Sequence, residues 1–302
     1  MDKRFNIVGF GEVLWDIYPD KKYLGGAISN SIYHINKLCH NGILISKVGK
    51  DKHGEEIIDK LSDKGISTEY IQVDPDKKTG TVTVTLDENA IPSFKCSTGS
   101  AFEFIDWSEK FEKLVDLTDA FLFGTLAQIN SHSRKTLHKL IAKLKNSVIV
   151  YDINLRGWPG ETKKLIEKSL YRCHLLKLNY EEFLKLKDIF NVRYKEDISS
   201  LKKIMDNFNI KLISLSLGAE GCLILNRDKV VHSPGVKVKP IDTTGAGDAF
   251  IAGTIVKFLE NASLEEIAEF SNLLGAFITT QKGATPEYNP EVINKFKMKL
   301  NT

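Results

Sequence analysis

The residues best suited to chemistry form one short segment, Asp242–Asp248, which reads Asp-Thr-Thr-Gly-Ala-Gly-Asp. Small residues that lead into a helix leave backbone N–H groups open, and the helix dipole favours negative charge there. We therefore expect this segment to hold a phosphate or to stabilise a phosphoryl group during its transfer. Asp248 would follow in the first helical turn, where a carboxylate can accept a proton from an attacking hydroxyl. The alternative is an ordinary helix N-terminus with an acidic first turn.

Two other nucleotide-binding motifs are absent from the sequence. No glycine is followed, after four spacer residues, by Gly-Lys-Ser/Thr, so the chain has no P-loop motif. Gly9-Phe10-Gly11 begins like a dinucleotide fingerprint, but the third glycine would fall at Leu14. The sequence therefore argues against a Rossmann oxidoreductase and favours phosphoryl transfer without a P-loop.

A second candidate site lies near the N-terminus. Gly25 and Gly26 precede a predicted helix that carries Asn30 in its first turns, and Asp16 lies nearby in the sequence. Glycine lets the backbone approach a small ligand, and an amide side chain can both donate to and accept from hydroxyls. An acid, an amide and open N–H groups are typical of a polyol site. Alternatively, Asn30 faces solvent on its helix and Asp16 is a turn residue.

The elements that must position these residues alternate between short apolar runs and segments of helical period. The apolar runs predict strands at Phe5–Phe10, Ile43–Val48, Ala120–Phe123, Val148–Ile153, His174–Leu178 and Lys211–Leu215. Helices are predicted at Gly26–Leu38, Asp51–Lys64, Ser131–Lys145, Glu161–Leu170, Ile198–Phe208, Gly245–Leu259 and Ser263–Thr280. This alternation predicts one α/β domain, residues 1–302, with a doubly wound, mostly parallel sheet and helices on both faces.

One segment departs from this pattern and predicts a small, separate β structure. Residues 81–86 alternate strictly between polar and apolar side chains, and Phe94 resumes the alternation after a polar turn. This pattern is typical of an antiparallel hairpin with one face in solvent, here Thr81–Cys96. Together with a short strand at Val13–Tyr18, it predicts a β lid over a site. The lid would comprise residues 13–27 and 77–104; the alternative is an ordinary edge hairpin.

The composition is that of an ordinary globular protein. The chain has 302 residues, of which 42% are hydrophobic and 27% charged, and its net charge is +3. We therefore expect neither a nucleic acid nor a membrane as partner. No apolar run reaches the roughly 18 residues of a membrane helix, and no secretory signal is recognisable. The cysteines lack C-x-x-C spacing, so we expect buried thiols in a reducing, cytoplasmic compartment at Cys39, Cys96, Cys173 and Cys222.

Several motifs, in order along nearly the whole chain, resemble those of the ribokinase-like (PfkB) carbohydrate kinases. The sugar-side motifs are Gly11-Glu12-x-Leu14-x-Asp16 and Gly25-Gly26-Ala27-x-x-Asn30. The first family signature is matched by Val48-Gly49-Lys50-Asp51-x-x-Gly54 and the second by Asp242–Asp248. The remaining matches are Asp152-Ile153-Asn154-Leu155-Arg156, Asn179-Tyr180-Glu181-Glu182, Leu217-Gly218-Ala219-Glu220-Gly221 and Gly283-Ala284.

This resemblance implies a ribokinase-like fold and a kinase that uses ATP. Asp248 would be the general base, and the N–H groups of Gly245, Ala246 and Gly247 would form the anion hole. Arg156 would offer charge to the phosphates, although a surface ion pair is the alternative. The sugar would be bound by Asp16, Gly25, Gly26, Asn30 and, from the lid, Phe94.

The resemblance also implies how nucleotide and metal are held. The nucleotide-side residues would be Asn179, Leu217, Gly218, Gly221, Asn272, Gly283 and Ala284, with Asn272 either against the adenine or simply on its helix. Glu182 and Asn179 would organise Mg²⁺ largely through water, as suits an ion that dehydrates reluctantly. Asp242 and Thr244 match positions at which some relatives bind a monovalent cation such as K⁺. Because lids of this family can pair between subunits, a homodimer is a further hypothesis.

The sugar is predicted from the branch that the motifs resemble most. Gly11–Asp16, Leu24–Ala27 and Gly124–Gln128 look most like fructokinases, which implies conversion of D-fructose to fructose 6-phosphate. Departures from that branch are Ile28-Ser29, Ile129 and the loop Gly157-Trp158-Pro159-Gly160. They leave 2-keto-3-deoxygluconate, ribose and a nucleoside as alternative substrates. A non-catalytic sugar- or nucleotide-binding relative is a different class, but the presence of Asp248 and Glu182 argues against it.

Overall fold

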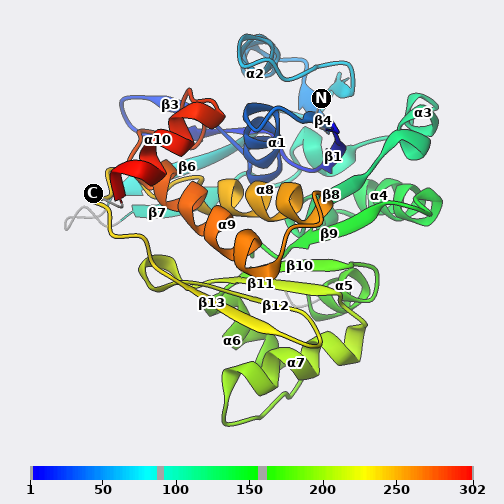
Figure 1. Ribbon diagram of the computed structural model, residues 1–302. Helices are drawn as coiled ribbons and strands as arrows, with labels where there is room; N and C mark the ends of the chain where they lie inside the picture. Colours follow the sequence, from blue (N-terminus) through cyan, green and yellow to red (C-terminus); the bar gives the residue numbers. More distant parts are fainter. Residues whose placement is uncertain (1–2, 87–91, 156–161, 301–302) are drawn as a thin grey trace.

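A parallel sheet forms the centre of the computed structural model, which describes residues 3–86, 92–155 and 162–300, with the backbone alone for 84–86 and 92–95. These residues form a nine-stranded main sheet in the order β13-β12-β11-β10-β9-β8-β1-β4-β5 (Figure 1). Its strands are β1 (Asn6–Phe10), β4 (Asn41–Gly49), β5 (Ile71–Asp74), β8 (Ala120–Gly124), β9 (Val148–Asp152), β10 (Leu175–Asn179), β11 (Leu212–Ser216), β12 (Gly221–Leu225) and β13 (Val230–Pro234). Neighbours from β11 to β5 are parallel, whereas β12 pairs antiparallel with both β11 and β13. The predicted mostly parallel sheet is confirmed.

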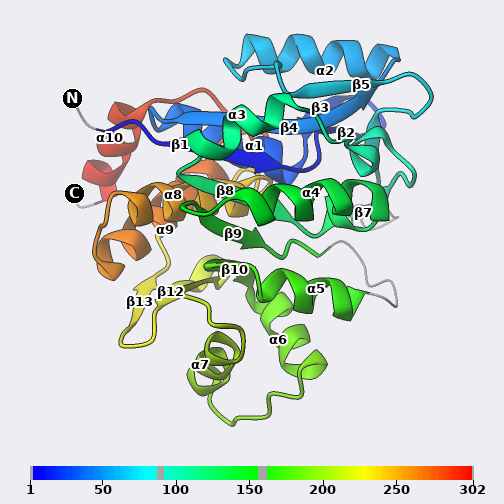
Figure 2. The same cartoon turned by 90° about the vertical axis from the view of Figure 1, so that its right-hand side faces the viewer.

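Helices cover both faces of the main sheet, because successive strand side chains point to opposite sides. In β1, Ile7 enters the core beneath one helical layer and Val8 the core beneath the other. The first layer comprises α1 (Ala27–Lys37), α2 (Lys52–Asp63), α8 (Ala246–Leu259), α9 (Leu264–Thr279) and α10 (Pro290–Leu300) (Figures 1 and 2). The second comprises α3 (Lys110–Leu117), α4 (Ser131–Lys143), α5 (Thr162–Leu170), α6 (Tyr180–Ile189) and α7 (Asp197–Phe208).

The strand order places a topological switch beside β1. The chain passes from β1 to β4 and β5 on one side and then returns to β8, β9, β10 and β11 on the other. In open α/β sheets, ligands bind outside the carboxyl ends of the strands near such a switch. β9 ends at Asp152 and β10 at Asn179, so the polar residues of these two ends lie at one edge.

A second sheet of four strands, the small sheet, also forms within the described residues. Its order is β3-β2-β6-β7, and its strands are β2 (Leu14–Ile17), β3 (Lys22–Gly25), β6 (Gly80–Leu86) and β7 (Pro92–Cys96). β6 and β7 are antiparallel, as predicted for the hairpin, whereas β2 lies parallel to β6. Leu14 and Val82 pack with Phe102 in a separate core. The small β-sheet expected beside the main sheet is therefore present.

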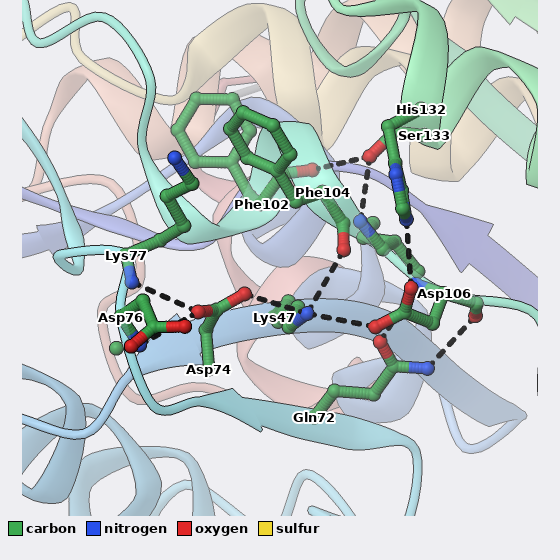
Figure 3. Close-up of polar contacts among 12 residues, drawn as sticks. Lys47, Gln72, Asp74, Asp76, Lys77, Phe102, Phe104, Asp106, His132 and Ser133 are labelled. Atoms are coloured by element: carbon green, nitrogen blue, oxygen red, sulfur yellow. Dashed lines mark hydrogen bonds and ion pairs between the residues drawn. The ribbon is translucent and has the colours of Figure 1, made fainter.

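The buried ammonium of Lys47 on β4 holds both segments that connect the small sheet to the rest of the molecule (Figure 3). It lies 2.7 Å from Asp74, which precedes β6, and 2.9 Å from Asp106, which follows β7. It also donates to the carbonyl oxygen of Phe104 at 3.0 Å. Asp106 in turn contacts His132 at the start of α4 at 2.7 Å. One cation thus ties the two connections to the main sheet.

Asp74 also shapes the chain that leads into β6. Its Oδ1 accepts hydrogen bonds from the N–H groups of Asp76 at 2.9 Å and Lys77 at 2.8 Å (Figure 3). Although burial raises it, hydrogen bonds from Lys47 and from these N–H groups lower the pKa of Asp74 to about 2. Asp74 is therefore charged at neutral pH, and the buried Lys47 has a charged partner.

The prediction that all four cysteines are buried is wrong for two of them. Cys173 and Cys222 are buried, but Cys39 is exposed and Cys96 is partly buried. Cys39 follows the C-terminus of α1 with a φ of 66°, where the chain turns at the surface. Cys96 is the last residue of β7 in the small sheet, which has little core of its own.

Within the described part of the chain, no helix is both long and apolar enough to cross a bilayer.

Candidate active site

The N-terminus of α8 carries the backbone predicted to bind a phosphoryl group. Gly245 is its N-cap with a φ of 80°, in the left-handed region that favours glycine. A β-carbon there would lie 2.6 Å from the Cα of Ala284, so space also requires glycine. Among the described residues no side chain caps this turn, and the N–H of Ala246 donates to Thr243 at the long distance of 3.3 Å. The positive end of the helix dipole is therefore open to an anion.

Asp248 and Asn30 are in direct contact although 218 residues separate them in the sequence. The Nδ2 of Asn30 donates to Oδ2 of Asp248 at 2.9 Å. Asn30 is 4% exposed, which excludes the alternative that it faces solvent. Within the described structure, the buried Oδ1 of Asn30 has no hydrogen-bond partner. The sugar-side and phosphate-side motifs thus meet at one point, where α1 packs beside α8 (Figure 1).

The other sugar-side residues gather at the start of α1. Asp16 on β2 lies against Gly25, where an added β-carbon would come within 2.3 Å of Asp16 Oδ2. Gly26 is the N-cap of α1, and the next N–H, that of Ala27, donates to the buried carboxylate of Glu12 at 3.1 Å. Phe94 lies on β7, where only the backbone is described.

A cavity of about 440 Å³ opens beside the first turn of α8. Four of the predicted nucleotide-side residues line it, together with two of the anion-hole residues: Asn179, Gly218, Gly221, Asn272, Ala246 and Gly247. Asn272 also donates from Nδ2 to the carbonyl oxygen of Pro234 at 2.7 Å, so it braces the wall as well. Most of the lining is apolar, as suits the flat face of a purine base.

Three other predicted nucleotide-side residues do not line this cavity. Leu217 packs against the core beneath the second helical layer. Gly283 donates its N–H to Asp242 Oδ2 at 3.0 Å. Ala284 is buried against Gly245, and its carbonyl oxygen lies 3.0 Å from Nε2 of His34 on α1. Gly283 and Ala284 therefore support the loop that precedes α8.

Lys177 and Asp152 form a buried ion pair at the same edge. They stand directly opposite each other on β10 and β9, and the ammonium lies 3.0 Å from Asp152 Oδ1. Burial alone would lower the pKa of Lys177, but the carboxylates of Asp152, Glu182 and Asp248 together raise it. Burial raises the pKa of Asp152 to about 6, against the opposing effect of Lys177. Of the described residues that line the cavity, Lys177 alone is charged.

Glu182 and Asn179 form a reciprocal cap at the start of α6. Asn179 Oδ1 accepts from the N–H of Glu182 at 2.9 Å, and Glu182 Oε2 accepts from the N–H of Asn179 at 2.8 Å. Glu182 Oε1 accepts from the N–H of Leu155 at 2.9 Å. Glu182 is 4% exposed, so the segment after β9, the end of β10 and the start of α6 fix its position together.

Comparison with known proteins identifies the family. The model of the pfkB family carbohydrate kinases matches residues 11–291. The chain belongs to this family. An uncharacterized sugar kinase of Pyrococcus horikoshii is 32% identical over 289 residues, 94% of this chain and 89% of the relative. Its crystal structure is similar with a TM-score of 0.83 over 97% of both chains at 31% identity. A second structure of that kinase contains ATP.

Fructokinases are also among the similar proteins. Fructokinase-2 of Oryza sativa is 29% identical over 309 residues, 93% of this chain and 90% of the relative. The structure of the Vibrio cholerae fructokinase with fructose, ADP and calcium is similar with a TM-score of 0.82 at 26% identity, over 97% of this chain and 98% of that one. A double mutant of that fructokinase was crystallised with fructose, ADP and potassium.

The carboxylates of this PfkB kinase fit a water-mediated magnesium ion better than a direct cage. No group of three or more His, Cys, Asp or Glu in the described residues could hold a metal by itself. Each oxygen of Glu182 accepts one backbone N–H, and a carboxylate oxygen has a second lone pair for a water molecule. Mg²⁺ usually keeps several waters and takes one or two carboxylates together with substrate phosphates. The donors present therefore fit that arrangement.

The predicted monovalent-cation residues form part of the loop before α8. Asp242 Oδ1 accepts from the N–H of Thr244 at 2.9 Å, and its Oδ2 accepts from Gly283. Although burial raises it, these hydrogen bonds lower the pKa of Asp242, so it carries a negative charge. Arg156, the predicted phosphate-side arginine, lies outside the described residues.

Lys177 was not predicted as functional, and Glu12 was named only as part of a sugar-side motif, without a role of its own. Both residues stand out in the sequence, because Lys177 interrupts an apolar run and Glu12 lies beside a glycine. Charged residues at such positions are rarely buried without a partner. Lys177 interrupts the run Leu-Leu-Lys-Leu of β10. Glu12 is 2% exposed and directly follows Gly11.

Proposed function

We propose that this carbohydrate kinase transfers the γ-phosphoryl group of ATP to the 6-hydroxyl of D-fructose. The observation that carries the proposal is the 2.9 Å contact between Asn30 and Asp248 at the open N-terminus of α8. This contact places an amide that can hydrogen-bond a sugar hydroxyl next to a carboxylate that can act as a base, and both lie beside a site for an anion. The fructokinases among the similar proteins support fructose, and the ATP-containing structure of the Pyrococcus kinase supports ATP as donor.

In the proposed mechanism, Asp248 accepts the proton of the sugar hydroxyl as the hydroxyl oxygen attacks the γ-phosphorus. The new O–P bond forms while the bond between this phosphorus and the bridging oxygen of ADP breaks. The N–H groups of Gly245, Ala246 and Gly247 and the dipole of α8 stabilise the charge on the transferring group. Asn30 holds Asp248 in place and offers its Oδ1 to a sugar hydroxyl.

The proposal also covers the nucleotide, the two kinds of cation, the lid and the pairing of subunits. The nucleotide would occupy the cavity beside α8, with Mg²⁺ held by Glu182 and Asn179 through water and neutralising phosphate charge when bound. Asp242 and Thr244 would bind K⁺, as supported by the potassium form of the Vibrio fructokinase mutant. The small sheet would act as a lid over the sugar bound at Asp16, Gly25, Gly26 and Phe94. Arg156 would contribute charge, and a cytoplasmic homodimer paired through the lid is part of the hypothesis.

A panel of sugars tests this function. ADP release would be measured with ATP and D-fructose, ribose, 2-keto-3-deoxygluconate and a nucleoside, with and without Mg²⁺. We expect saturable, Mg²⁺-dependent release with fructose, and phosphate on its 6-oxygen by ³¹P and ¹³C NMR. Release with one of the other acceptors alone would contradict fructose while leaving sugar kinase activity intact.

A further inference from the structure

We propose that Lys177 is a further catalytic residue, whose ammonium contacts the phosphates of the nucleotide, and that Asp152 is a positioning residue that aims it. The inference rests on the proposed transfer from ATP and is independent of which sugar accepts the group.

The ammonium of Lys177 lies between the first turn of α8 and the cavity beside it. A β-carbon on Gly247, in the first turn of α8, would lie 3.3 Å from Nζ of Lys177. The same side chain lines the cavity beside α8 and is 6% exposed. A compact positive charge thus stands against the anion-binding turn and at the wall of the nucleotide cavity.

The side chain of Asp152 fixes the direction in which the Lys177 ammonium points. Lys177 and Asp152 are paired residues on adjacent parallel strands, and Nζ lies 3.0 and 3.3 Å from the two carboxylate oxygens. An ammonium has three N–H donors. Within the described structure, its hydrogen bonds go to the Asp152 carboxylate alone, so donor capacity remains for a phosphate oxygen.

A purely structural pair would be an unusual choice at this position. A buried ion pair is seldom better for stability than well-packed apolar residues of similar volume. β10 otherwise reads Leu-Leu-x-Leu, and an apolar residue would continue it. The pair is found instead at the edge where Asn179 and Glu182 also lie, which is the edge facing α8.

Lys177 supplies charge in this step and transfers no proton. The proton of the acceptor hydroxyl goes to Asp248, one O–P bond forms, and one bridging P–O bond to ADP breaks. The ammonium stays protonated and stabilises the oxygens that carry charge as the group moves. Asp152 keeps its contact with the ammonium throughout and does not touch the reacting atoms.

The test compares Lys177→Met with Lys177→Arg and with the double variant Asp152→Asn/Lys177→Met, which removes the charge of Asp152 together with that of Lys177. Affinities for ADP and AMP are measured by calorimetry without sugar, and kcat is measured with the best acceptor. We expect Lys177→Met and the double variant to lower kcat by roughly 10²-fold. Both should weaken ADP binding about tenfold relative to AMP binding, because AMP lacks the β-phosphate that the ammonium would contact in ADP. Lys177→Arg should restore part of the ADP affinity, since it keeps the charge.

The double variant keeps the test decisive if the single variant unfolds. A double variant that melts like the wild type but retains kcat within about fivefold would overturn the proposal. Equal weakening of ADP and AMP would also overturn it, because that result indicates a distorted cavity. Lys47→Met removes another buried, ion-paired lysine, on β4 and outside the cavity lining, and should leave the ratio of ADP to AMP affinity unchanged. Since the binding measurements need no sugar, an inactive enzyme on fructose would refute the substrate and leave Lys177 testable.

Discussion

At the scale of single residues, the site depends on the contact between Asn30 and Asp248. A carboxylate acts as a base only when it is held within hydrogen-bond reach of the proton it accepts. The amide of Asn30 provides that hold from a different helix, at 2.9 Å, and its buried Oδ1 has no partner in the described structure. A buried acceptor of this kind is costly unless a ligand satisfies it. This observation supports the proposal that Asn30 both binds the sugar and positions Asp248.

Replacing Asn30 with alanine should impair sugar use far more than nucleotide binding. A hydrogen bond to a charged group contributes about 1.5–3 kcal/mol, so we expect kcat/KM for the sugar to fall roughly 10- to 100-fold. The Kd for ADP should stay within about twofold, since Asn30 does not line the nucleotide cavity. Asn41→Ala is the matched control, because this asparagine is exposed and lies at the start of β4, away from the carboxyl ends of the strands. If both variants lost the same activity, the role of Asn30 would be refuted.

The sequence allowed some of these residues to be predicted and not others. Gly245, Asp248 and Asn30 were predictable because a local pattern, small residues before a helix, has a direct chemical meaning. The partnership of Lys177 with Asp152 depends on β9 and β10 being neighbours in register, which the chain by itself does not specify. The distant pairing of Asn30 with Asp248 likewise requires α1 to pack beside α8.

At the scale of elements, the small sheet depends on anchors in the main sheet. Lys47 on β4 contacts both connections, through Asp74 on one side and through Asp106 and the Phe104 carbonyl on the other (Figure 3). The contacts of Lys47 fix where the strands of the small sheet lie, and this sheet is the proposed lid over the sugar. Loss of Lys47 should therefore weaken sugar binding more than nucleotide binding.

Lys47→Met should destabilise the protein and raise KM for the sugar more than KM for ATP. It leaves the buried carboxylate of Asp74 unpaired, which typically costs about 3–5 kcal/mol. Urea unfolding and steady-state kinetics measure the two effects. The control is Lys143→Met, which removes the exposed ion pair with Glu112 and should cost less than about 1 kcal/mol. Equal rises in the two KM values would indicate that Lys47 supports the whole fold and not the small sheet in particular.

Several elements were not predicted from the sequence, each for its own physical reason. β13, at the antiparallel end of the main sheet, buries only one of its five residues, so it does not resemble a buried parallel strand. α6 follows β10 with no intervening loop, so one pattern runs into the next. α10 buries Ile293 alone, which leaves a weak apolar stripe. Strongly apolar parallel strands, by contrast, were predicted with nearly their observed bounds.

At the scale of the whole molecule, the fold gathers residues from distant segments at one edge. The chain begins at β1 in the interior of the main sheet, builds outward on both sides, and ends with α8, α9 and α10 on one face (Figure 1). This path brings the ends of β9 and β10, the start of α1 and the start of α8 to one place. The order of the motifs and the alternation of elements were enough to predict the architecture, but not the contacts across that edge.

The most direct test of the account is the kcat of Asp248→Asn, measured with saturating ATP and sugar alongside its affinity for ADP. The variant keeps the size of the side chain and its contact with Asn30 but removes the proton acceptor. We expect kcat to fall by roughly 10²- to 10⁴-fold while the affinity for ADP stays within about twofold. A fall in kcat of less than about fivefold would contradict the assignment of Asp248 as the base, and with it the central claim.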